Sequence, residues 1–349
     1  MTQPGKAETR RRLPFRVARI LLPVLVGLGA ATLLLMVVGI PQLTAALARF
    51  RLTAIPLVVL LLLGAYGAQG WRWHLLLQDC GLRLSFGDSQ LLNLAGQLPS
   101  AVLPIGDLAR ALFASQAARG SFGVAAATVT VQELGFTLLM VLVSAPGIVA
   151  LGAGIGPAVL LVAGVVFVIV VLTVEPVFRL LDALVGRLPP TRPLRRELQE
   201  LQRSTVALLS RPRTLAGLLL DLLRAAITVT AFWLIAQQLE PGRLSWTLAA
   251  FVLTFAFAGG ALSTIPGGVG VSEAGLVALL VWTGTSPGAA AAAAILQRTF
   301  GSGIAVFVGV LAYSGARRRH QLGSLVGLKR RLAEARRRSL SQARDASVP

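Results

Sequence analysis

Two short stretches of the sequence combine helix-breaking residues with charged side chains. The first contains Pro104, Gly106 and Asp107, followed one turn later by Arg110. Proline and glycine end the helix before them, and aspartate is a favourable cap for the helix that follows. A helix that begins here would present free N–H groups and the positive end of its dipole, which attract anions. Arg110 would add a positive charge on the same face.

The second stretch, from Pro266 to Glu273, repeats this design. Its glycines let the backbone approach a ligand closely, and we expect Ser272 to cap the next helix, with Glu273 in the first turn. In an alternative interpretation, both breaks are structural and the acidic residues only cap helices. The expected substrate-binding residues are Arg110, Arg298, Gly106, Gly268, Gly270 and Ser272, and the expected helix breaks are Pro104, Pro266 and Gly267.

Two single charges lie inside long apolar segments, Glu133 in one and Arg298 in another. A charge in such a segment costs several kcal/mol (~2.5–3.5 on insertion scales) and usually faces a partner or a cavity. The two could pair with each other, or could serve proton coupling and head-group binding respectively. A plain interhelical salt bridge is equally open. The candidates for gating or proton coupling are Asp107, Glu133 and Glu273.

The remaining charged residues favour structural roles. Asp221 and Arg224 lie three residues apart on one helix face, which predicts a mutually neutralised pair. Arg72 lies between two tryptophans, which predicts an anchor at the membrane interface. The two histidines, His74 and His320, are isolated, so we expect no metal site. We also expect no cofactor, because the glycine-rich second stretch lacks the Lys-Ser/Thr of a phosphate loop and no dinucleotide fingerprint appears.

The segments that must position these residues are long and apolar. Of the 349 residues, 55% are hydrophobic and only 13% are charged, too few charges for the surface of a soluble domain. A helix of ~20 apolar residues crosses the hydrocarbon of a bilayer. The sequence therefore predicts an all-α, polytopic membrane helix bundle. The six predicted spans are residues 17–40, 55–77, 122–151, 157–180, 215–239 and 289–313.

Segments too short to cross predict two re-entrant half-helix hairpins. Residues 84–100 and 106–118 form the first, and the second breaks at residues 265–270. The tetrapeptide Arg83-Leu-Ser-Phe86 recurs as Arg243-Leu-Ser-Trp246, each time after a span and before a broken segment. Three spans per half is an odd number, so the two halves would have opposite orientations. This predicts an inverted internal repeat, which many transporters use.

The formal net charge of +19 comes from 33 Lys and Arg against 14 Asp and Glu. Basic residues gather beside the ends of apolar blocks with almost no aromatic residues between them, which favours anionic lipid surfaces over nucleic acid. The positive-inside rule then places both termini in the cytoplasm, and we expect a bacterial cytoplasmic membrane. The single cysteine, Cys80, excludes an internal disulfide. The expected regions are a basic N-terminus (1–16), a first membrane repeat (17–180), a basic amphipathic linker (181–213), a second membrane repeat (214–316) and a basic tail (317–349).

At these residues the chain resembles the family of the lysylphosphatidylglycerol synthase transmembrane region, also called the flippase-like domain. The first signature of that family stands here as Gly96-Gln-Leu-Pro99 and, further on, Leu103-Pro-Ile-Gly-Asp-Leu-Ala-Arg-Ala111, with the acidic Glu133 in the next span. The later signature, Pro-Gly-Gly-x-Gly-x-x-Glu, stands at residues 266–273 and is followed by Arg298. The family often has an arginine directly after the acidic residue, where this chain has a leucine.

The resemblance implies a flippase, not driven by ATP, that moves an anionic or glycosylated lipid, with a polyprenyl-linked sugar among the options. Its partners would be membrane lipids. No aminoacyl-transferring domain is recognised in the sequence, so we expect a translocator and not an enzyme. Two alternatives stay open. One is a membrane-embedded enzyme that uses Asp107 with Glu133 or Glu273 as an acid/base pair on a lipid head group. The other is a non-transporting scaffold whose basic tail recruits a cell-envelope biosynthesis enzyme. The oligomeric state is not predicted.

Overall fold

The computed structural model describes residues 39–102, 106–187, 199, 202, 206, 212–263, 268–323, 327–328, 330–332 and 334–335. Every regular element in these ranges is helical. The predicted N-terminal region (1–16) lies outside the described residues, as does nearly all of the first predicted span (17–40). Most of the predicted linker and most of the tail also lie outside them, together with Pro104, Pro266 and Gly267.

In the first half of the chain a pair of short helices lies between two long helices, and a third long helix, α7, follows. Its elements are α2 (Ile40–Arg49), η1 (Leu52–Ala54), α3 (Ile55–Asp79), α4 (Phe86–Val102), α5 (Leu108–Ala117), α6 (Phe122–Ala150), α7 (Ile155–Thr173) and α8 (Glu175–Arg187). The span predicted at 157–180 is wrong at its end, because α7 stops at Thr173 and α8 follows as a separate helix. Pro176 explains this: it has no N–H to continue the ladder, but it suits the first turn of a new helix.

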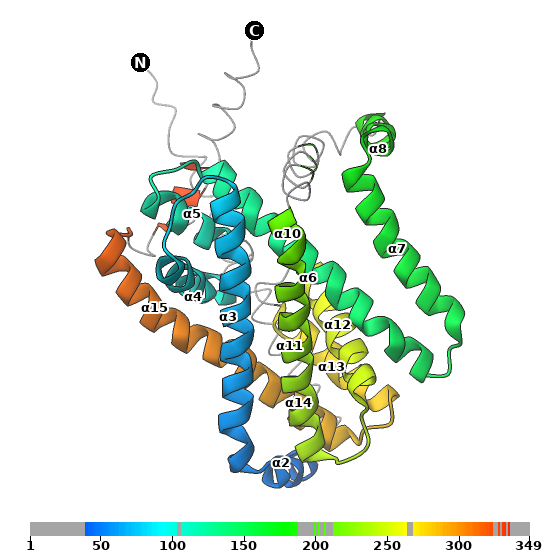
Figure 1. Cartoon of the computed structure of the whole chain (residues 1–349). Coiled ribbons are helices and arrows are strands. Elements are labelled where there is room, and N and C mark those ends of the chain that lie inside the picture. Colours follow the sequence, from blue (N-terminus) through cyan, green and yellow to red (C-terminus); the bar gives the residue numbers. More distant parts are fainter. Residues whose placement is uncertain are drawn as a thin grey trace, which may run out of the picture.

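The second half repeats the pattern of a long helix, two short helices and a long helix. Its elements are α10 (Pro212–Ala216), α11 (Leu218–Leu239), α12 (Trp246–Leu262), α13 (Val271–Trp282), α14 (Pro287–Arg298), η4 (Thr299–Gly303) and α15 (Ile304–His320). The short helices α4, α5, α12 and α13 are the arms of the two predicted hairpins (Figure 1).

Five of the described helical segments are long and apolar enough to cross a membrane. They are Leu52–Asp79, Phe122–Ala150, Ile155–Thr173, Arg213–Leu239 and Pro287–His320, whereas α12 and α13 are apolar but shorter. Large apolar side chains such as Ile155, Leu160 and Phe167 of α7 are exposed on the surface of the bundle, where lipid would cover them. The predicted all-α, multi-pass membrane helix bundle is confirmed.

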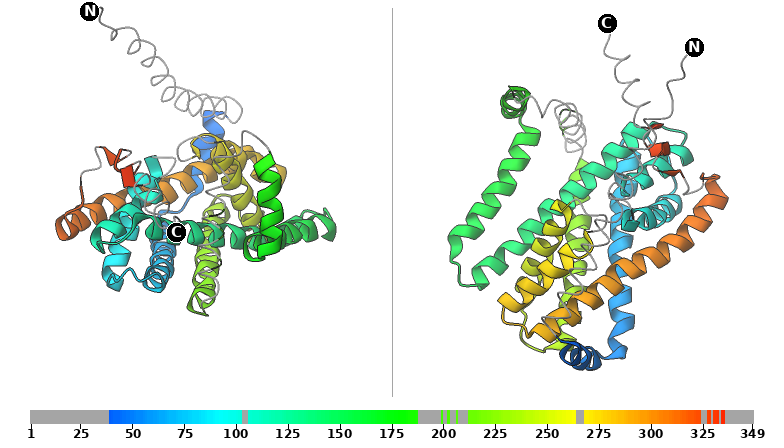
Figure 2. Two further views of the ribbon diagram at one scale, coloured as in Figure 1. Left: turned by 90° about the horizontal axis from the view of Figure 1, so that it is seen from above. Right: turned by 180° about the vertical axis from the view of Figure 1, so that it is seen from behind.

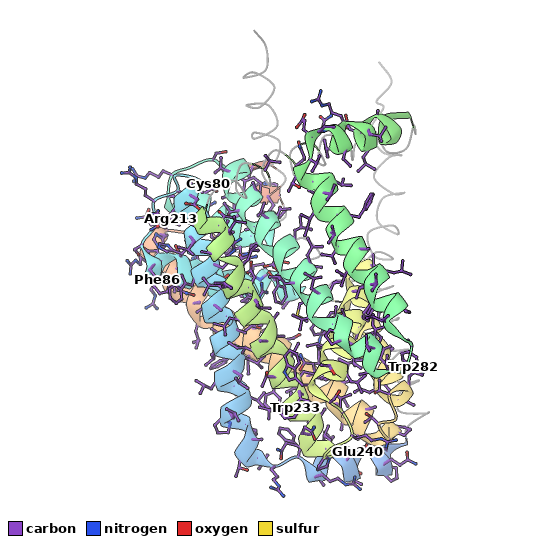
Figure 3. The ribbon with its side chains drawn as sticks, turned by 45° about the vertical axis from the view of Figure 1, so that its right-hand side comes forward. Cys80, Phe86, Arg213, Trp233, Glu240 and Trp282 are labelled. Carbon is purple, nitrogen blue, oxygen red and sulfur yellow. The ribbon has the colours of Figure 1, made fainter. Side chains whose placement is uncertain are left out.

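The two halves run in opposite directions. Figure 3 places Cys80, which follows α3, and Arg213, which precedes α11, at one end of the molecule, and Glu240, which follows α11, at the other. The helices α3 and α11 are therefore antiparallel, and they pack side by side. The helix α15 packs along α4, and α6 packs along α12 in return (Figure 2). Each hairpin is thus held by the long helix of the other half, as an inverted repeat requires.

The repeated tetrapeptide has the same local structure in both halves. The hydroxyl of Ser85 accepts a hydrogen bond from the N–H of Asp88 at 3.0 Å, and the hydroxyl of Ser245 accepts one from the N–H of Leu248 at 3.2 Å. Each serine therefore satisfies an otherwise unpaired donor at the start of a hairpin's first arm, α4 or α12. The sequence match reflects one shared helix-start motif.

A run of alanines lets α14 lie deep in the bundle. Every side chain from Ala289 to Ala294 is buried, and α14 packs against α2, α11 and α13. Small side chains allow helix backbones to approach closely inside a membrane, where no hydrophobic effect drives helices together. This packing brings Arg298, at the end of α14, into the middle of the bundle beside α13.

Candidate functional site

The two hairpins and the helices behind them enclose a cavity of about 800 Å³. Its wall is largely apolar, with residues such as Phe136, Met140 and Leu276. Its polar side chains include Ser100 and Asp107 from the first hairpin, Ser272 and Glu273 from the second, and Arg224 and Arg298 from two long helices. A cavity of this size, apolar with a few charged groups, suits a small-molecule or lipid head-group ligand.

Glu273 and Arg298 form an ion pair on this wall. Arg298 Nη1 lies 3.2 Å from Glu273 Oε1, and the two side chains are 32% and 21% exposed. The other carboxylate oxygen, Oε2, accepts a hydrogen bond from the N–H of Gly270 at 2.6 Å, so Glu273 also caps α13. Gly270 has a φ of +86°, a conformation that side chains disfavour. The cap therefore depends on glycine at this position.

A π-helical segment, η4, follows Arg298 directly and interrupts the last long helix. Such segments add one residue to a turn and are frequent at functional sites. Gly301 and Ser302 of η4 line the cavity, and the carbonyl of Gly301 accepts a hydrogen bond from the Tyr66 hydroxyl at 3.2 Å. The segment thus turns backbone groups of the second half toward α3.

The first half has an ion pair at the matching place, with the charges exchanged. Arg110 is the third residue of α5 and Glu133 the twelfth of α6, just as Glu273 is the third of α13 and Arg298 the twelfth of α14. Arg110 Nη2 donates to Glu133 Oε1, and its Nη1 donates to Asn93 Oδ1 at 3.0 Å.

The arginine of this first pair is buried, whereas the Glu133 side chain is 29% exposed. The side chain of Arg110 is only 1% exposed, and its guanidinium lies 5.5 Å from the ring centroid of Trp73. Arg110 does not line the cavity. The structure therefore places this predicted binding residue behind the wall, where it holds Glu133 in position.

Arg224, on α11 of the second half, brings a positive charge to the Glu133 carboxylate and to the cavity. Its Nη1 lies 3.5 Å from Glu133 Oε1, so Arg224 and Arg110 share one carboxylate. Its guanidinium also lies 3.8 Å from the ring centroid of Phe136. Arg224 lines the cavity. Two guanidinium groups against one carboxylate leave an excess positive charge at this side of the cavity.

The tip of the first hairpin is closed by a hydrogen bond between its arms. The Ser100 hydroxyl donates to Asp107 Oδ1 at 2.9 Å. Asp107 makes no side-chain cap on α5, so the predicted cap is wrong: its backbone is already helical and its carboxylate turns across the hairpin to Ser100. Gly106 makes this approach feasible, because a Cβ there would overlap the carbonyl of Pro99.

The tip of the second hairpin also differs from the predicted cap. The Ser272 hydroxyl donates to the carbonyl of Gly268 at 2.7 Å and does not accept from the start of α13. Glu273 takes the capping role instead, because its longer side chain reaches back to Gly270. Gly268, Ser272, Glu273, Arg298 and Asp107 line the cavity, whereas the predicted binding residues Gly106 and Gly270 are not part of its lining.

For the remaining charged residues, the predicted partners and positions are wrong. Asp221 accepts from Arg72 Nε at 3.1 Å, not from Arg224, and Arg72 is 1% exposed, not an interfacial anchor. Arg72 also donates to the carbonyl of Thr214 at 2.7 Å. Although Asp221 and Arg224 share one side of α11, closer partners on α3 and α6 decide the pairing. Likewise, Glu133 and Arg298 do not pair with each other, since each has a partner within its own half.

A layer of amide side chains was missed at the level of the sequence. Gln69 Nε2 donates to Glu133 Oε1 at 3.1 Å, and Gln97 Nε2 donates to Gln69 Oε1 at 3.1 Å. Gln97 reaches the cavity, so this chain of amides links the cavity to the buried ion pair. The signal was present: Asn93 and Gln97 lie four residues apart in a stretch of α4, residues 91–99, that is otherwise apolar.

The sequence also matches the model of a known protein family. The family model of the lysylphosphatidylglycerol synthase TM region matches residues 20–338. The chain belongs to this family. The match spans both hairpins and both ion pairs, and it associates the chain with membrane functions related to lipids. A search of curated proteins gives no match.

Proposed function

We propose that this family member moves an anionic or glycosylated lipid across a membrane, with the head group in the cavity between the two hairpins. The observation that carries the proposal is the pair of cavity-facing arginines, Arg224 and Arg298, in a largely apolar wall deep in a membrane bundle. Charges at such depth usually mark a substrate path. The membership in a lipid-related family supports the same substrate class.

The residues have distinct roles in this proposal. Arg224 and Arg298 attract the phosphate of the head group, and Ser100 and Gln97 offer hydrogen bonds to its hydroxyl groups. Arg110 acts indirectly by holding Glu133. The acyl chains stay in lipid beside the cavity, near the exposed Phe257 of its lining.

We further propose that the membrane is the cytoplasmic membrane and that the Cys80 end faces the cytoplasm. The last turn of α15 carries Arg317, Arg318 and Arg319, and Arg213 lies at the Cys80 end (Figure 3). The positive-inside rule associates such basic residues with the cytoplasmic side. Labelling of single cysteines placed at residue 240 and, in separate variants, at residue 213 would test this orientation.

The test is a lipid-translocation assay in proteoliposomes. Fluorescent lipids with phosphatidylglycerol, phosphatidylethanolamine and glycosylated head groups are offered, and a membrane-impermeant quencher reports the fraction that changes leaflet. We expect the wild type to move at least one anionic or glycosylated lipid. We expect Arg298→Gln to lower the rate at least tenfold, an effect of roughly 1.4 kcal/mol or more.

Arg179→Gln is the matched control, because Arg179 pairs with Glu175 at an exposed site on α8, outside the cavity. It should move lipid at the wild-type rate. Failure of the wild type to move any of these lipids would refute the proposal. Turnover of a head group by the purified protein in detergent would instead favour the membrane-embedded enzyme.

A further inference from the structure

The carboxylate of Glu273 occupies the donors that an anionic ligand would need. One of its oxygens lies 3.2 Å from Arg298 Nη1, and the other accepts the N–H of Gly270 at 2.6 Å. A phosphate that approached Arg298 from the cavity would compete with Glu273 for the guanidinium, and displacing the carboxylate would free the Gly270 N–H at the start of α13. Glu273 therefore stands where the ligand would bind, as an internal competitor.

The charges around the cavity already balance before a ligand arrives. Among the described residues, its wall carries Arg224 and Arg298 against Asp107 and Glu273. Arg110 and Glu133, just behind the wall, form a neutral pair. An anion that entered would leave one uncompensated negative charge in a medium of low dielectric constant, which is costly. One added proton would restore neutrality.

We propose that binding of an anionic head group displaces the Glu273 carboxylate from Arg298 and Gly270, and that Glu273 then takes up one proton from solution. This inference rests on the proposed function and adds its energy source: the translocator would be a proton–lipid cotransporter with one proton per anionic charge. The proton adds to a carboxylate oxygen and no covalent bond breaks, so the site holds neutral Glu273, Arg298 and the anion. The partial exposure of both side chains gives protons and ligand access from the cavity.

The surroundings of Glu273 contain few other groups that could titrate. Its helix packs against α12, which has no titratable residue, and against α14, whose only charged residue is Arg298. Across the cavity lie Asp107 and Arg224. Among the residues that the structure describes, Asp107 is the one other carboxylate in the wall, and its hydrogen-bonding partner Ser100 is not a donor that the ligand takes from Glu273. Because the ligand competes with Glu273, and not with Asp107, for hydrogen-bond donors, Glu273 is the carboxylate that takes up the proton.

The test counts protons on binding. Purified full-length protein in detergent is titrated with short-chain phosphatidylglycerol, whose phosphodiester stays ionised, by calorimetry at pH 5–9 in two buffers of different ionisation enthalpy. We expect uptake of about one proton per ligand in the alkaline part of this range, where the apparent affinity should fall about tenfold per pH unit. For Glu273→Gln we expect uptake near zero, an affinity that does not depend on pH, and tighter binding than wild type at pH 8–9.

Glutamine suits this variant, because its amide oxygen can still accept the Gly270 N–H and keep the cap on α13. Asp107→Asn is the matched control in the same cavity, and it should keep the uptake of about one proton whatever its affinity. Binding without proton uptake by the wild type, or undiminished uptake by Glu273→Gln, would overturn the coupling and leave the proposed function standing. No binding by either protein at any pH would overturn the anion site and its proton coupling, whereas the proposed function is overturned only by failure of the translocation assay.

Discussion

In the first half of the chain a guanidinium on the short helix α5 meets a carboxylate on the long helix α6, and in the second half the two charges are exchanged. Arg110 and Glu133 are joined by Asn93 and Gln69 in a network that leaves Arg110 almost no exposed surface. Glu273 and Arg298 stand on the cavity wall and remain partly exposed. The difference in exposure lies at the short-helix residue, since Arg110 is 1% exposed and Glu273 is 21% exposed, whereas Glu133 and Arg298 are 29% and 32% exposed. The same repeat position thus holds a buried, structural residue in one half and a cavity-facing residue in the other.

The largest expected effect tests whether the first pair holds the fold. Arg110→Met leaves the buried Asn93 Oδ1 without its donor and removes the buried guanidinium from Glu133, which keeps Arg224 and Gln69, so we expect a loss of about 3 kcal/mol in the free energy of unfolding. Thermal unfolding in detergent measures it. Arg298→Met removes a partly exposed pair and should cost about 1 kcal/mol or less. Equal shifts in unfolding temperature for the two variants would remove the distinction between the halves.

A smaller effect on stability is expected for a change at Gly270, whose N–H holds Glu273 of the second pair in position. Gly270→Ala places a side chain on a backbone with φ +86°, which should cost about 1–3 kcal/mol and weaken the hydrogen bond to Glu273. We expect slower lipid translocation together with a lower unfolding temperature. Gly242→Ala is the control, since Gly242 has φ +74° in an exposed turn away from the cavity. A similar loss of translocation in both variants would show that strain alone accounts for it.

The smallest effect on stability is expected for a change at Arg224, which shares the Glu133 carboxylate with Arg110. Arg224→Gln leaves Glu133 with Arg110 and Gln69, so the unfolding temperature should stay close to that of the wild type. Translocation should fall about tenfold, roughly 1.4 kcal/mol, because the cavity wall loses one of its two arginines. Arg224→Lys should recover part of the rate. Full activity of Arg224→Gln would leave Arg298 as the sole binding arginine.

Local signals in the sequence were enough to find the site but not its pairings. The breaks around Asp107 and Glu273 follow from proline and glycine, whose effect on a helix needs no tertiary information. The depth of Glu133 and Arg298 follows from the length of the apolar segments. The pairing of Asp221 with Arg72 could not be foreseen, because it depends on how α11 packs against α3.

The sequence alone also did not predict that the charges of the two pairs are exchanged, although all four residues were identified as candidates. It emerges only when both helix starts are known, since Arg110 and Glu273 correspond by position within α5 and α13 and not by residue type. Glu273 as the cap shows the same limit. Serine is the stronger capping residue by propensity, but the backbone at Gly270 points its N–H to the longer side chain.

The buried alanine run of α14 bears on how the second half can move. Alanine has no side-chain torsion that must change, so one alanine surface can slide along another helix without passing through strained rotamers. The larger side chains of the neighbouring helices would otherwise interlock and resist such a displacement. The alanines at 289–294 would therefore let α14 slide along its neighbouring helices without a change of rotamers. Such a sliding motion would displace Arg298, which lies at the end of α14.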